Sequence, residues 1–197
     1  MMNPVKEFIL QSEQNLRIAI AVSEAWPEAR RDIADRFIRQ LESDLRPRLK
    51  GWIFEHYRLH PERERLSFYF YKPDWKGPLP GAGSDEQPQY YVNLEFGGGQ
   101  ATIFGLARNE RISRIGASTF SPAALAAVGK AITGTRVRAK KWWEAMATLQ
   151  APGDDWSDVA ILWRMHQDPE FRKEVARQLL DVARACEAVV DRLVRSK

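Results

Sequence analysis

The longest apolar pattern in the sequence lies near its C-terminal end. Six apolar residues there alternate steps of four and three: Val175, Leu179, Val182, Cys186, Val189 and Leu193. This is the heptad spacing of one face of a long helix, which we expect to begin at Asp168-Pro169-Glu170. A helix of about 27 residues is roughly 40 Å long, so its apolar seam needs cover from protein. The cover comes either from the N-terminal helices or from a second copy, as a homodimer through the C-terminal helix.

The N-terminal quarter has a matching surface. Residues 5–24 and 27–49 are predicted to form two helices, separated at Trp26-Pro27 because proline disfavours helix in the residue before it. In the second helix four apolar residues recur every four positions: Ile33, Phe37, Leu41 and Leu45. We expect this stripe to cover the C-terminal seam and to bury Cys186.

The middle of the chain changes period. Aromatic and β-branched residues predict four strands, at 52–59, 66–71, 90–96 and 101–107. Short turns join the first two and the last two, and Lys72–Pro88 is predicted to be a loop because it is rich in proline and glycine. The remaining segments, 123–132, 136–149 and 158–165, are predicted helices. The sequence thus predicts a single α+β domain over residues 1–197, a four-stranded antiparallel meander sheet flanked by N-terminal and C-terminal helices.

The composition indicates an ordinary globular protein without disulfides, and it bears on the cellular compartment. Of the 197 residues, 44% are hydrophobic and 28% charged, as in an ordinary globular protein. Cys186 is the one cysteine, so no intramolecular disulfide forms. The first residues lack the apolar core of a signal peptide, and the apolar run at 18–22 is too short to span a bilayer. We therefore expect a cytoplasmic protein without a membrane partner.

Common metal and cofactor motifs are missing from the sequence. His56 and His60 lie on a predicted strand and turn, about 13 Å apart, and His166 is isolated. Gly97-Gly98-Gly99 precedes a strand instead of a phosphate-binding helix. We expect no metal site and no cofactor.

Two acidic residues lie in a pattern that resembles a known protein family. Pro73-Asp74, followed by Glu95 on a predicted strand, resembles the proline–acid and acid-x-lysine elements of the PD-(D/E)XK nucleases. In that family two carboxylates and a lysine hold magnesium and orient the attacking water. The resemblance implies Asp74 and Glu95 as candidate catalytic residues. Glu95-Phe96-Gly97 lacks the lysine, however, which puts nuclease activity in doubt.

A broader likeness covers roughly residues 35–110. This part of the chain is similar to the region that follows the catalytic core in bacterial and phage PD-(D/E)XK-type proteins. The likeness rests on a succession of features: a helix, Gly51-Trp52, a strand ending in Lys72-Pro73-Asp74-Trp75, a further strand and Phe104-Gly105-Leu106. Residues 1–34 do not contain such a catalytic core. The likeness therefore implies an accessory or recognition module from a defence, counter-defence or mobile-element setting.

Two aromatic segments are candidate contact surfaces. Four cations adjoin Trp142 and Trp143, a pattern that suits phosphates and unpaired bases: Arg136, Arg138, Lys140 and Lys141. The alternative is a tryptophan docked on the sheet beside solvated cations. In the loop, Lys72, Trp75 and Lys76 form a partner-binding surface if Trp75 is exposed, and a cap on the core if it is not.

The sequence favours a binding protein over an enzyme. We expect a non-enzymatic macromolecule-binding protein of bacterial or phage origin, whose partner is a protein or a nucleic acid. The alternatives are a nucleic-acid-binding accessory factor and a diverged metal-dependent nuclease. The net charge of +4, from 30 basic and 26 acidic residues, permits nucleic-acid contact without arguing for it.

Overall fold

The computed structural model describes residues 3–60, 65–79, 86–97, 100–109, 111, 120–132, 138–140, 142–148 and 158–195. The helices are α1 (Pro4–Leu10), α2 (Glu13–Leu45), α4 (Pro122–Ala131), α5 (Val159–Gln167) and α6 (Pro169–Arg195). The strands are β1 (Ile53–His60), β2 (Arg65–Tyr71), β3 (Lys76–Gly77), β4 (Gln87–Pro88), β5 (Tyr90–Gly97), β6 (Gln100–Arg108), β7 (Arg138–Lys140) and β8 (Trp143–Thr148). A 3-10 turn, η2 (Pro73–Trp75), follows β2. The mixed α+β class predicted from the sequence is confirmed.

The main sheet is larger than predicted. Its antiparallel strands run in the order β1-β2-β5-β6-β8-β7, so the four predicted strands form the expected meander and two further strands extend it. The prediction of four strands is therefore wrong, and so is the helix at 136–149, which contains β7 and β8. Glu144, Ala145 and Met146 favour helices in isolation, but the free edge of β6 offers them a hydrogen-bonded partner. Strand propensity yields readily to such context.

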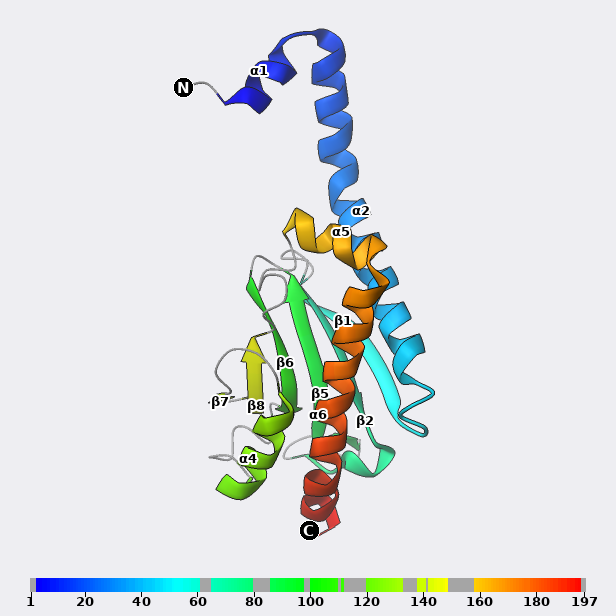
Figure 1. Cartoon of the computed structure of the whole chain (residues 1–197), viewed down its shortest axis with the longest axis vertical. Coiled ribbons are helices and arrows are strands. Elements are labelled where there is room, and N and C mark those ends of the chain that lie inside the picture. Colours follow the sequence, from blue (N-terminus) through cyan, green and yellow to red (C-terminus); the bar gives the residue numbers. More distant parts are fainter. Residues whose placement is uncertain are drawn as a thin grey trace.

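The described helices that pack on the sheet share one of its faces. Figure 1 shows α6 running along the sheet, with α2 on one side of it and α4 on the other. The seam of α6 is buried in that layer at five positions: Val175, Leu179, Val182, Cys186 and Val189. Its neighbours include Phe37 of α2, whose ring stacks on that of Phe171 at 5.7 Å between centroids. The predicted cover by the N-terminal helices is confirmed, and of the six seam residues only Leu193 is partly exposed.

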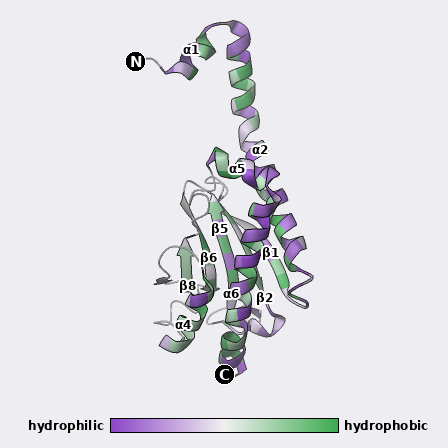
Figure 2. Ribbon diagram, in the orientation of Figure 1, coloured by the Kyte–Doolittle hydropathy of each residue, from purple (hydrophilic) through white to green (hydrophobic). Residues whose placement is uncertain are grey.

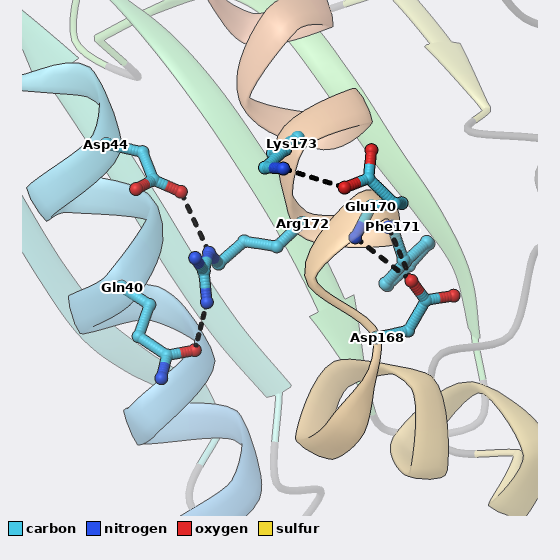
Figure 3. Close-up of polar contacts among 7 residues, drawn as sticks. All are labelled: Gln40, Asp44, Asp168, Glu170, Phe171, Arg172 and Lys173. Atoms are coloured by element: carbon cyan, nitrogen blue, oxygen red, sulfur yellow. Dashed lines mark hydrogen bonds and ion pairs between the residues drawn. The ribbon is translucent and has the colours of Figure 1, made fainter.

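Polar contacts fix α6 at its start. The Asp168 carboxylate accepts hydrogen bonds from the backbone N–H groups of Glu170 and Phe171, both at 3.0 Å, as the predicted cap requires (Figure 3). The bond from Phe171, and then Arg164, hold the pKa of Asp168 below its ordinary value. In the next turn Arg172 donates to Asp44 at 2.8 Å and to Gln40 at 2.9 Å (Figure 3). These bonds tie α6 to α2 across 128 and 132 positions of sequence.

The first helix boundary differs from the prediction. The chain turns at Gln11-Ser12, where Ser12 caps α2, and α2 then continues through Pro27 without a break. A proline inside a helix leaves the carbonyl four residues earlier without its partner, at a considerable cost in a buried helix. Here that carbonyl belongs to Ser23, an exposed residue that solvent can reach. The predicted break at Trp26-Pro27 is therefore wrong.

The first half of α2 stands away from the rest of the molecule. In Figure 1, α1 and this part of α2 project beyond α5 and the end of the sheet. None of the α2 residues before Ala34 is buried, and neither is any residue of α1. We call residues 3–32 the arm. Within the described residues, no helix is both long enough and apolar enough to cross a membrane.

Candidate functional site

The two acids suggested by the nuclease resemblance lie on different elements, Glu95 on the sheet and Asp74 on η2. Glu95 of β5 lies opposite Ser67 of β2, whereas Asp74 follows the end of β2 at Tyr71. The four residue steps from Ser67 to Tyr71 alone cover about 13 Å. Asp74 is also exposed on η2, and Glu95 is half-buried on the sheet. The register does not bring the two carboxylates together at one ion.

Glu95 belongs instead to a polar row on the sheet face that points away from α6. Arg65 pairs with one Glu95 oxygen at 2.5 Å, and Asn93 donates to the other at 3.0 Å. Asn93 in turn accepts from the Ser67 hydroxyl at 2.8 Å. Among the described residues, no group of three or more His, Cys, Asp or Glu side chains could hold a metal. The contacts of Glu95 are those of a structural carboxylate.

The same face carries a second polar cluster. Glu55 of β1 accepts hydrogen bonds from the phenols of Tyr69 and Tyr71, the latter at 2.7 Å. Burial, and then the bond to Glu55, raise the pKa of Tyr71 above that of a free phenol. The Lys76 ammonium lies 5.8 Å from the centre of the Tyr71 ring. The cluster joins β1 to β2 and leads into β3, with both carboxylate oxygens of Glu55 already bonded.

Trp75 is buried against the core, which is the second of the two positions predicted for it. It is fully buried, meets Trp52 edge-on with 5.0 Å between ring centroids, and donates its indole N–H to Asp191 at 2.8 Å. Lys72 also binds Asp191, at 2.7 Å, and pairs with Glu187 at 3.2 Å. Trp75 therefore caps the core, and a partner-binding surface anchored on an exposed Trp75 is ruled out. These contacts dock η2 on the C-terminal half of α6.

The charges around η2 shift one another's pKa. Burial disfavours the charged form of Lys72, but its bonds to Asp191 and Glu187 outweigh this and raise the pKa of the ammonium. Burial likewise disfavours the Asp191 carboxylate, yet Lys72 and Trp75 together lower its pKa. Lys72 and Asp191 are therefore both charged over a wide pH range.

The basic segment is only partly within the described residues. Arg136 and Lys141 lie outside them, and of Arg138 and Lys140 the structure describes the backbone alone, as edge strand β7. Trp143 is buried, with 5% of its surface exposed, and packs with Ala107 and Met146 on the sheet face opposite the described helices. Trp142 is 52% exposed. Of the two indoles, Trp142 is the exposed one, and Trp143 takes the alternative position, docked on the sheet.

The exposed apolar residues are gathered in one region. The described part of the chain has eleven large hydrophobic residues that are exposed, and all but Trp142 lie on the arm or on α5. On the arm they are Val5, Phe8, Leu10, Leu16, Ile18, Ile20, Val22 and Trp26, between 38% and 65% exposed. Figure 2 shows hydrophobic residues recurring along α1 and the projecting part of α2. A patch of this extent on a protein surface marks an interaction site.

α5 extends this patch at the base of the arm. Its inner side buries Ile161, Leu162 and Met165, and α5 contacts α2. Its outer side bears Val159 and Trp163, one helical turn apart and 66% and 64% exposed. Arm and α5 together form what we call the arm surface.

The sequence contained a signal for the arm surface. In Leu16-Arg17-Ile18-Ala19-Ile20-Ala21-Val22 every second residue is a large apolar one. On a helix, residues two apart point about 200° from each other, so these four cannot all face one core. The prediction considered the apolar run at 18–22 only as a possible membrane span, for which it is too short.

Comparison with protein-family models, with curated protein sequences and with solved structures finds no match for this chain. The proposals below therefore rest on the residues and their geometry.

Proposed function

We propose that this chain is a non-enzymatic binding protein that contacts another protein through the arm surface. The observation that supports the proposal is the confinement to the arm and α5 of ten of the eleven exposed large apolar residues in the described part of the chain. Burying such side chains yields about 25 cal/mol per Å2 of apolar area, and a helix that projects into water gains none of it alone. A bacterial or phage origin, in a defence, counter-defence or mobile-element setting, remains part of the proposal through the family resemblance.

The charge of the arm favours a protein over other macromolecules. Residues 3–32 carry four basic side chains and five acidic ones. Amphipathic helices that bind membrane surfaces, like segments that bind nucleic acids, are enriched in lysine and arginine. The arm has no such excess, and its binding energy has to come from apolar contact.

The test compares capture by matched variants of the full chain. The tagged protein, produced in the organism that encodes it, is expected to retain a protein partner, a second copy of the chain included. Leu16→Glu with Ile20→Glu should abolish that retention, because glutamate keeps the helix but removes the apolar contact. Ala127→Glu with Ala188→Glu adds the same charge at exposed positions of α4 and α6, and should retain the partner. Equal capture by both variants would contradict the proposal.

Nucleic-acid binding is the second candidate function. It is favoured by the exposure of Trp142 next to β7, which brings part of the basic segment to the sheet edge. Replacing the four cations at 136, 138, 140 and 141 by serine should then abolish binding to single-stranded DNA or RNA. That binding should weaken steeply with salt, as counterion release requires. Binding that does not respond to salt, or that survives the four substitutions, would remove this candidate.

A further inference from the structure

The apolar residues of the arm form two stripes on opposite sides of α2. Leu16 and Ile20 lie about five helical turns before the buried residues Ala34 and Ile38, so they continue the core stripe beyond the body of the molecule. Ile18 and Val22 lie on the opposite side. A single helix packed against the arm covers one stripe and leaves the other in water. The occupant therefore has to supply two apolar helical surfaces.

The arm itself has such a pair of surfaces. It consists of two helices, α1 and α2, which meet at a fixed corner: Ser12 caps α2, and the Asn15 side chain donates to the Phe8 carbonyl at 2.8 Å. α1 exposes Val5, Phe8 and Leu10 in addition to the two stripes of α2. A second arm can therefore cover both sides of the first.

The apolar residues also occur at both ends of the arm. Phe8 and its neighbours form the tip, and Trp26, with Val159 and Trp163 of α5, forms the base. Residues 13–32 of α2 span roughly 30 Å. When two arms lie antiparallel over that length, the tip of each reaches the base of the other. A two-fold interface has this self-complementary property, since each contact occurs twice.

The net charge of the arm and its exposed apolar area are both compatible with pairing of two arms from identical chains. Four basic and five acidic residues leave the arm nearly neutral, so two copies do not repel each other strongly. Ten large apolar side chains, most of them about half exposed or more, offer on the order of the 800 Å2 per partner that a standard interface buries.

We infer that the arm surface is a dimer interface, in which the α1–α2 arms of two copies pack antiparallel and the tip of each docks on α5 of the other. The inference rests on the proposed function and names the partner of the same surface. It differs from a dimer through α6, because five of the six residues of that apolar seam are buried within the single chain.

The mass of the full chain in solution tests the inference. Light scattering over concentrations of about 1 to 100 µM should give twice the 22.7 kDa chain mass at the upper end. Leu16→Glu with Ile20→Glu, and separately Ile18→Glu with Val22→Glu, should each give a monomer with unchanged helix content by circular dichroism. The α4 and α6 control, Ala127→Glu with Ala188→Glu, should remain a dimer. A monomeric wild type, or a dimer that survives both arm variants, would overturn the inference.

Crosslinking tests the antiparallel arrangement. Phe8→Cys protein mixed with Trp163→Cys protein should form a disulfide-linked dimer containing one of each on mild oxidation. Phe8→Cys mixed with Ala188→Cys should not, because Ala188 is exposed on α6, outside the arm surface. If the second pair links as well as the first, the antiparallel arrangement is wrong.

The two experiments fail in different ways. A monomeric wild type that still captures another protein through Leu16 and Ile20 overturns the dimer and leaves the proposed function standing. A monomer without arm-dependent capture overturns both.

Discussion

Two contacts at single residues hold β8 against β6. Gly105 has a φ of +146°, and a Cβ at that position would lie 2.1 Å from the Ala145 carbonyl oxygen, so only glycine permits the close approach. Three residues later Arg108 donates to Glu144 at 3.0 Å, with both side chains almost completely buried. Sequence patterns could not pair these two charges, because they lie 36 positions apart and Glu144 belongs to a segment predicted to be helical.

The ion pair gives a prediction at the same scale. Glu144→Leu should lower the free energy of unfolding by about 3–5 kcal/mol, since it removes the carboxylate beside a buried guanidinium. Arg108→Met combined with Glu144→Leu should recover much of that loss, because neither charge is then desolvated. Urea unfolding of the two single variants and the double variant measures the coupling. Strictly additive losses would show that the pair does not act as a unit.

At the scale of elements, contacts with α6 determine the position of the segment that follows β2. The segment from Lys72 was predicted to be an irregular loop because of its prolines and glycines. Its first residues instead form η2, and Trp75 and Lys72 both bind Asp191, more than 110 positions away. A carboxylate on the C-terminal half of α6 thereby turns a candidate partner-binding loop into part of the core.

This contact predicts how stability depends on pH. The pKa of Asp191 is lowered on folding, so its contribution is complete above the unfolded value of about 4 and is lost as pH falls through the folded value. The pKa of Lys72 is raised, so its contribution is complete below about 10.4 and is lost as pH rises beyond the folded value. Asp191→Asn should therefore cost about 1–2 kcal/mol at pH 7 and clearly less at pH 3.

Denaturant unfolding at pH 7 and pH 3 measures this difference. Asp181→Asn is the matched control on the same helix, since Asp181 pairs with Arg177 at a more exposed site, and it should cost less than about 0.5 kcal/mol at either pH. A loss for Asp191→Asn that is the same at both pH values would show that its carboxylate charge adds nothing to stability.

The whole molecule has two parts with different surface chemistry. In the body, α2, α4, α5 and α6 share one apolar core with the sheet. The arm continues the core stripe of α2 past the point where other helices cover it, and it buries no residue of its own. This division explains how one continuous helix serves both packing and, in our proposal, association: only its second half is needed for the core.

The sequence by itself determined the elements whose pattern is local. The seam of α6, the Asp168 cap, and the strands β1, β2, β5 and β6 follow from spacing, from residue types and from a few neighbouring residues, and all of them were predicted correctly. These signals suffice because an apolar stripe can be buried only in the conformation that its period fits.

The tertiary structure decided what depends on a distant partner. β8 forms because β6 presents a free edge, α2 passes through Pro27 because solvent reaches the carbonyl at Ser23, and Trp75 is buried because Asp191 accepts its N–H. The arm is the same kind of case. Its apolar residues can be recognised in the sequence. Their exposure, however, depends on how far α5 and α6 extend along α2, and no local sequence pattern specifies that distance.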